Sequence, residues 1–179
     1  MHPLSAPGLM AAALLAVAGA QKVVDPTMTI GALRALRAPA GPWLVRTGAA
    51  AELALGVVAI VVGGRLTWSL VALSYLAFTA FVMAALRRGT MVGSCGCFGR
   101  ADTPPHASHV VVNLVLAGVA GALAGAGVPT PLDGFGTEPT GSGATVALAT
   151  VGLYLLHAVY VDLPRNLAVM TTATATARP

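Results

Sequence analysis

The sequence has very little charge for its length. Only 9% of its 179 residues are Asp, Glu, Lys or Arg, whereas 56% are hydrophobic, and the mean hydropathy is +0.82. A soluble domain carries roughly a quarter charged residues, because water must wet its surface. Ten basic and six acidic residues cannot cover such a surface, and the basic ones are scattered among apolar runs. The shortage argues against a soluble enzyme, a disordered chain and a nucleic-acid-binding domain, and favours an integral membrane protein.

Five apolar segments approach the roughly 20 residues that a helix needs to cross the hydrocarbon core. They cover residues 8–24, 43–63, 66–86, 110–127 and 143–161. Because lipid offers an open backbone no hydrogen bonds, these segments should be helical. We therefore predict an all-α polytopic membrane bundle with a four-helix core and a fifth transmembrane helix. Residues 1–164 should form one membrane domain, and residues 165–179 a flexible tail.

The basic residues are distributed unevenly between the predicted loops. With five spans, nine of them fall on one side of the membrane, and Arg65 alone falls on the other. The nine are Lys22, Arg34, Arg37, Arg46, Arg87, Arg88, Arg100, Arg165 and Arg178. Loops rich in Lys and Arg stay in the cytoplasm. We therefore expect a multi-pass protein of a bacterial inner or plasma membrane, with its N-terminus outside and its first and third loops in the cytoplasm.

Residues 26–38 lie between the first two predicted spans. They contain Arg34 and Arg37 among apolar residues. Such a stretch fits a short amphipathic helix on the membrane surface, with both arginines toward the headgroups. An ordinary connecting turn is the alternative.

The two cysteines of the chain stand one residue apart, in Gly93-Ser94-Cys95-Gly96-Cys97-Phe98-Gly99. A Cys-Gly-Cys turn can bring its Cα atoms within the roughly 4.4–6.8 Å that a disulfide needs, but the small ring is strained. Strain raises the reduction potential, as in disulfides that exchange. A disulfide that closes so short a loop removes little conformational entropy from the unfolded chain, so stabilisation of the fold does not explain it well. The pair predicts a thiol–disulfide oxidoreductase with Cys95 and Cys97 as catalytic residues.

Two other interpretations of the cysteines remain open. Cys95, Cys97, His106 and His109 form a C-x-C…H-x-x-H set of possible zinc ligands, although the spacing is not that of a usual zinc finger. In that case the protein would be a metal-binding or non-catalytic maturation scaffold. Both cysteines could instead be small inert residues at a membrane boundary.

Several polar residues lie within or beside the predicted spans. Lys22, Glu52 and Asn113 fall in the half of the membrane that also holds the cysteine loop, as do Gln21 and His157. An ionisable side chain in a span usually faces the bundle interior and has a partner. We expect Glu52 to pair with Lys22 or Arg46, or to stay protonated. The residues would form either a polar pocket that accepts a proton or a quinone headgroup, or hydrogen-bonded contacts between helices.

Four stretches together resemble the MauE branch of the DoxX-like membrane proteins. The resemblance covers roughly residues 7–126. The stretches are Gln21-Lys22-Val23-Val24-Asp25-Pro26, Glu52-Leu53-Ala54-Leu55-Gly56, Ser94-Cys95-Gly96-Cys97-Phe98-Gly99 and Asn113-Leu114. The resemblance implies a four-helix core and thiol–disulfide chemistry, often beside a thioredoxin-like partner. The name-giving member is needed to mature a disulfide-rich subunit of methylamine dehydrogenase.

Carried over by position, the resemblance supports Cys95 and Cys97 as the redox pair. It marks Lys22, Glu52 and Asn113 as family positions without giving them a catalytic role. It also implies partners outside the cytoplasm, whereas the basic residues put the cysteine loop inside. One cysteine pair cannot carry electrons across a core roughly 30 Å thick. Three possibilities follow: a membrane quinone takes part, a cytosolic thiol protein exchanges with the pair, or the orientation is inverted. A homo-oligomer is possible through the Gly121-x-x-x-Gly125 motif.

Overall fold

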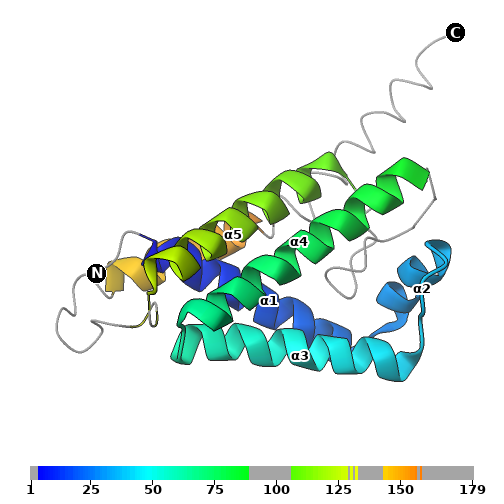
Figure 1. Cartoon of the computed structure of the whole chain (residues 1–179), viewed down its shortest axis with the longest axis horizontal. Coiled ribbons are helices and arrows are strands. Elements are labelled where there is room, and N and C mark those ends of the chain that lie inside the picture. Colours follow the sequence, from blue (N-terminus) through cyan, green and yellow to red (C-terminus); the bar gives the residue numbers. More distant parts are fainter. Residues whose placement is uncertain are drawn as a thin grey trace, which may run out of the picture.

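The computed structural model describes residues 4–88, 106–128, 130, 132, 143–156 and 158, and its described part is helical. Cys95, Cys97 and His157 lie outside the described residues. Five helices are arranged as shown in Figure 1, and a further helix spans Gly143–Leu156. The five are α1 (Ser5–Val24), α2 (Thr27–Ala35), α3 (Pro42–Val61), α4 (Arg65–Arg88) and α5 (Ala107–Ala126). The predicted all-α bundle is confirmed.

Four of these helices are long and apolar enough to cross a membrane. α1, α3 and α5 have 20 residues each and α4 has 24, so each is about 30 Å long or more. Many of their large apolar side chains point outward, such as Leu66 at 75% exposure and Val61 at 61%. Such exposure would be unfavourable in water and is expected in lipid. The chain is therefore a multi-pass membrane protein.

Two predicted segments differ in length from their helices. The helix Gly143–Leu156 is shorter than the predicted span of residues 143–161, and residues beyond 158 lie outside the described part. A fifth span stays a prediction. In the stretch of residues 26–38, α2 is a helix, so the helical interpretation of that stretch is confirmed over nine residues.

The core of the bundle lies where α1, α4 and α5 meet. Its largest fully buried side chains include Trp68 and Tyr75 of α4, Leu15 of α1 and Leu123 of α5. The polar groups of the two aromatic residues are satisfied. The Tyr75 hydroxyl donates to the Ala11 carbonyl oxygen at 2.7 Å, and Trp68 Nε1 donates to the Val128 carbonyl oxygen at 3.2 Å.

Two glycines allow α1 and α3 to cross at close range. A Cβ on Gly19 would lie 2.5 Å from the Leu53 backbone nitrogen and 2.7 Å from the Ala49 carbonyl oxygen. A Cβ on Gly56 would lie 2.6 Å from the Ala12 carbonyl oxygen. Small residues bring membrane helices together in this way. The crossing places the end of α1 against the first half of α3.

The two ends of the bundle are built differently. At one end α3 and α4 are joined by a tight turn in which Gly63 and Gly64 have φ values of 65° and 88°. The Gly64 N–H donates to the Val128 carbonyl oxygen at 3.1 Å, which ties this turn to the end of α5. From this turn α3 and α4 diverge, and α2 lies at the end where they are farthest apart (Figure 1).

α2 is attached to the end of α4. Ala32 and Leu36 are buried against Ala85 of α4. Arg88, the last residue of α4, donates from Nη1 to the Leu36 carbonyl oxygen at 2.5 Å. At one end of the bundle, the Gly64 turn is therefore hydrogen-bonded to the chain after α5. At the opposite end, α2 packs against the end of α4. This second end is called the α2 end below.

Candidate functional site

An ion pair inside the bundle is formed by Lys22 of α1 and Glu52 of α3. The buried face of α1 runs through Ala18 and Gly19 to Lys22, which is only 5% exposed. Its Nζ lies 2.5 Å from Glu52 Oε2, and the two side chains are 7% and 21% exposed. Of the two cations predicted as partners of Glu52, Lys22 is the one that contacts it, and Arg46 is exposed near the start of α3.

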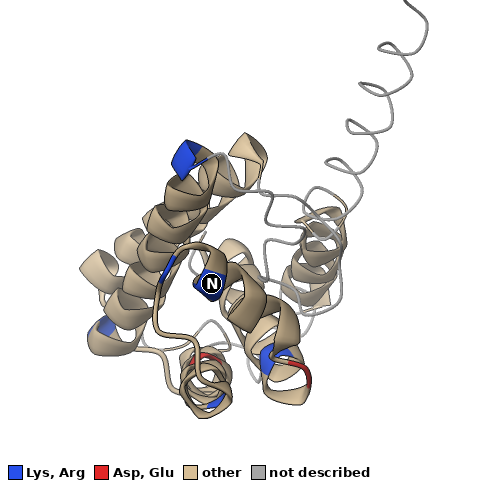
Figure 2. Cartoon of the chain, turned by 90° about the vertical axis from the view of Figure 1, so that its right-hand side faces the viewer, with Lys and Arg blue, Asp and Glu red and all other residues tan. Residues whose placement is uncertain are grey.

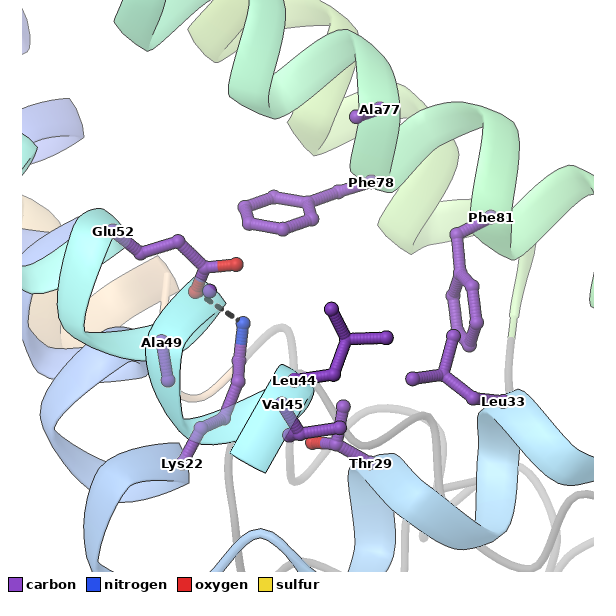
Figure 3. A pocket seen from close by; sticks show the side chains of 11 residues that line it. Lys22, Thr29, Leu33, Leu44, Val45, Ala49, Glu52, Ala77, Phe78 and Phe81 are labelled. Carbon is purple, nitrogen blue, oxygen red and sulfur yellow. Dashed lines mark hydrogen bonds and ion pairs between the residues drawn. The ribbon is translucent and has the colours of Figure 1, made fainter. Parts of the chain in front are cut away.

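An aromatic ring of α4 covers the ion pair. Lys22 Nζ lies 4.7 Å from the centroid of the Phe78 ring, close enough for a cation–π interaction. Phe78 in turn makes an edge contact with Tyr75, with ring centroids 6.0 Å apart and an angle of 87° between the planes. Figure 3 shows the Lys22 and Glu52 side chains pointing toward each other beside the Phe78 ring. The ammonium is thus held by a carboxylate and by a ring face.

The pair borders a cavity of about 240 Å³ between α1, α2, α3 and α4. Most of its walls are apolar (Figure 3). The lining residues are Lys22, Thr29, Leu33, Leu44, Val45, Gly48, Ala49, Glu52, Ala77, Phe78 and Phe81. The cleft is therefore mostly apolar, and the Lys22–Glu52 ion pair is the charged part of its lining.

The third residue of the predicted polar cluster does not line this cleft. Asn113 is 2% exposed on the buried face of α5, one turn after His109, which is 1% exposed. Neither residue is among those that line the cavity. The structure therefore brings Lys22 and Glu52 together at the cleft, and Asn113 is buried on α5 outside the cleft lining.

His106 and His109 cap the start of α5. His106 Nδ1 accepts from the Ser108 N–H at 3.2 Å, and His109 Nδ1 accepts from the His106 N–H at 3.2 Å. Such reciprocal bonds satisfy backbone donors that a helix start leaves open. Within the described residues no three His, Cys, Asp or Glu side chains gather as a metal site would require. The two cysteines of the alternative metal set lie outside that part, so the set as a whole stays a prediction.

The segment that carries both cysteines joins two helix ends at the α2 end of the bundle. It leaves α4 at Arg88 and enters α5 at His106. Arg88 holds α2 through the Leu36 carbonyl, and α2 also lines the cleft through Thr29 and Leu33. The attachment points of the cysteine segment and the α2 residues that line the cleft therefore share one end of the molecule.

Basic residues gather at the same end. Of the seven Lys and Arg residues in the described part, all but Arg65 belong to the last turn of α1, to α2 and its connection, to the first turns of α3 or to the last turn of α4. They are Lys22, Arg34, Arg37, Arg46, Arg87 and Arg88. Figure 2 views the chain from this end. Apart from Lys22 they are available to lipid headgroups, as expected for a membrane surface.

Phe78 and Phe81 line the cleft but were not predicted from the sequence as site residues. They stand three residues apart on α4, so they share one face of the helix. The available signal was their rarity, because the chain has only four phenylalanines, and two of them fall in this one span. Their place beside Lys22 depends on the divergence of α3 and α4, which spacing along the chain does not encode.

These features define a multi-pass helical membrane protein with a buried Lys–Glu pair in a cleft beside its α2 end. The family model of the methylamine utilisation protein MauE matches residues 3–126, which is more than half of the chain. The chain belongs to that family. The match ends with α5, so the helix Gly143–Leu156 lies beyond it. No curated protein and no solved structure matches the chain.

Proposed function

We propose that the protein is a membrane thiol–disulfide redox protein in which Cys95 and Cys97 cycle between a dithiol and a disulfide. The cycle would support disulfide formation or reduction, and so maturation, in a partner protein. A thioredoxin-like protein or another thiol protein is the proposed partner. The wider relationship to DoxX-like proteins is part of the same proposal, supported by the four-helix core.

The exchange follows from thiolate chemistry. The thiolate of one cysteine attacks a partner disulfide, an S–S bond forms between the two proteins, and the partner's second sulfur leaves as a thiolate that takes a proton. The other cysteine then attacks the mixed disulfide. The partner leaves as a dithiol with two added electrons, and the Cys95–Cys97 disulfide closes. The reverse sequence oxidises a partner dithiol.

The observation that carries this proposal is the position of the cysteine segment in the chain. Both of its attachment points, Arg88 and His106, are at the α2 end, where basic side chains gather. Cations near a thiol favour the thiolate, which is the attacking form. An inert linker would not need two cysteines one residue apart in a chain that has no others.

A Cys97→Ser or Cys95→Ser variant should trap a covalent adduct with the partner. The retained thiol can attack, but no second thiol is present to resolve the mixed disulfide. After free thiols are blocked in intact cells, a non-reducing gel should show a band of higher mass that dithiothreitol removes. The matched control is the Cys95→Ser/Cys97→Ser double variant, which should show no such band. If neither single variant gives an adduct that the double variant lacks, the exchange mechanism is wrong.

We further propose that the α2 end faces the cytoplasm of a bacterial plasma membrane. The support for that orientation is that six of the seven described basic residues lie at this end, and Lys and Arg are enriched on the cytoplasmic side. In the presence of a permeant reductant, a membrane-impermeant maleimide should label Cys95 and Cys97 only after the membranes are opened. As a control, Arg65→Cys in the double-serine background should react in intact cells, since Arg65 is the exposed first residue of α4 at the opposite end and a charged side chain at a helix end lies at the water interface. The reverse pattern would invert the orientation.

A further inference from the structure

The cleft beside Lys22 and Glu52 opens sideways between two membrane-spanning helices. Leu44 of α3 is 55% exposed, and Gly48 of α3 and Ala77 of α4 are exposed as well, although all three line the cavity. Because α3 and α4 span the membrane, this side of the cleft faces hydrocarbon. A molecule dissolved in the bilayer can therefore reach the ion pair without passing through water.

The charge in the cleft selects the kind of molecule. Lys22 and Glu52 neutralise each other, so an anionic or cationic headgroup would leave one buried charge unbalanced. A neutral polar head keeps the pair intact. The Lys22 ammonium has three N–H donors, and its bond to Glu52 among the described residues uses one of them. A carbonyl oxygen of the ligand can therefore accept a hydrogen bond from Lys22, and a hydroxyl can donate to Glu52.

The walls and the size of the cleft fit a flat ring. Phe78 and Phe81 line one side, and aromatic rings favour stacked or edge contacts with another ring. The volume of about 240 Å³ is smaller than the roughly 300–1,000 Å³ that encloses a drug-sized ligand. It admits one headgroup, while a hydrocarbon tail would remain outside between α3 and α4.

We propose that this cleft binds the ring of a membrane quinone. One carbonyl oxygen accepts a hydrogen bond from Lys22 Nζ, the ring lies against Phe78 and Phe81, and the isoprenoid tail leaves through the opening lined by Gly48 and Ala77. In the quinol form, the ring hydroxyl donates to the Glu52 carboxylate. Binding rests on the cleft alone, whereas its use as an electron acceptor rests on the proposed function.

The redox balance closes without a further reactant. Oxidation of the Cys95–Cys97 dithiol breaks two S–H bonds, forms one S–S bond and releases two electrons and two protons. A quinone that becomes a quinol takes up two electrons and two protons on its two oxygens. One dithiol therefore reduces one quinone. Quinol then diffuses back into the bilayer, so the protein would pass electrons from a thiol partner to the membrane pool.

A glycine in the cleft provides the test. A Cβ on Gly48 would meet no atom of the described residues within 4 Å, so Gly48→Leu should narrow the opening of the cleft without disturbing the fold. We expect full-length protein in nanodiscs to bind a decyl-benzoquinone saturably, as measured by calorimetry, and Gly48→Leu to weaken binding about tenfold or more. The matched control is Gly118→Leu on α5, where an added Cβ also meets nothing, and its affinity should equal that of the wild type.

Three further measurements decide between the quinone and other occupants. The Lys22→Met/Glu52→Leu double variant should also lose about tenfold in affinity, because the polar anchor is gone. Wild-type affinity in Gly48→Leu would overturn the proposal. Equal displacement of the quinone by decylbenzene, which has a ring and tail without carbonyls, would overturn it in favour of a lipid groove. The Cys95→Ser/Cys97→Ser variant should bind the quinone with wild-type affinity but should not reduce it when a dithiol reductant is supplied. This variant distinguishes a failure of quinone binding from a failure of the redox pair.

Discussion

Replacing Glu52 with leucine should lower the free energy of unfolding by about 3 kcal/mol. The substitution leaves the Lys22 ammonium at 5% exposure, and among the described residues the Phe78 ring is the partner that an interaction still links to it. A buried charge that has lost its partner cannot recover its hydration, so it stays uncompensated, which disfavours the folded state. Denaturation in detergent micelles, followed by circular dichroism, measures the loss.

Removing both charges should cost much less than removing one. The Lys22→Met/Glu52→Leu double variant should unfold within about 1 kcal/mol of the wild type, because apolar side chains of similar size suit this site. The difference between the double variant and the sum of the single variants is the coupling energy of the pair. Arg46→Met is the control: Arg46 is exposed near the start of α3, and its loss should change stability by less than about 0.5 kcal/mol. Additive single variants would show that the two charges do not interact.

The stability of the double variant also shows whether the Lys22–Glu52 ion pair serves the fold or ligand binding. A pair that two apolar side chains can replace with little loss is poorly explained by stability alone. In a span, an ionisable residue is expensive to place and usually marks a functional position. If the double variant folds well and loses quinone binding, the charges are kept for the ligand rather than for the fold.

Hydropathy alone was enough to predict the helices of the four-helix core. Runs such as the one inside α4 have no plausible state in a bilayer other than a helix, so length and composition decide the outcome. The sequence also predicted that Glu52 pairs with Lys22 or Arg46 or stays protonated, since an ionisable side chain in a span usually has a partner. Which cation pairs with Glu52 depends on which face of each helix points inward.

The cleft itself could not be predicted from the sequence. It exists because α3 and α4 meet at a tight turn and diverge toward α2, and the angle between two helices depends on side chains that interlock across them. Asn113 shows the same limit. It shares the membrane half of Lys22 and Glu52 in the sequence, yet its place on the buried face of α5 keeps it out of the cleft lining.

The close crossing of α1 and α3 gives the second large expected effect. Gly19 lies one turn before Lys22, and its nearest neighbours, Ala49 and Leu53, flank Glu52. An alanine at position 19 would put its Cβ 2.5 Å from the Leu53 backbone nitrogen. Backbone atoms cannot rotate away, so the helices must separate, and the ion pair must lengthen with them.

Gly19→Ala should therefore lower the free energy of unfolding by about 2 kcal/mol, the cost of overpacking a tight contact. The direction of the change in unfolding free energy distinguishes the two cases, because in an unconstrained helix alanine is about 1 kcal/mol more favourable than glycine and would stabilise the protein. Gly118→Ala on α5 is the matched control, because no atom of the described residues lies within 4 Å of the added Cβ, and it should be neutral or stabilising. The coupling energy between Lys22 and Glu52, measured in the Gly19→Ala background, should fall along with stability. If Gly19→Ala stabilises the protein as Gly118→Ala does, or leaves that coupling unchanged, α1 and α3 do not hold the pair together by close packing at Gly19.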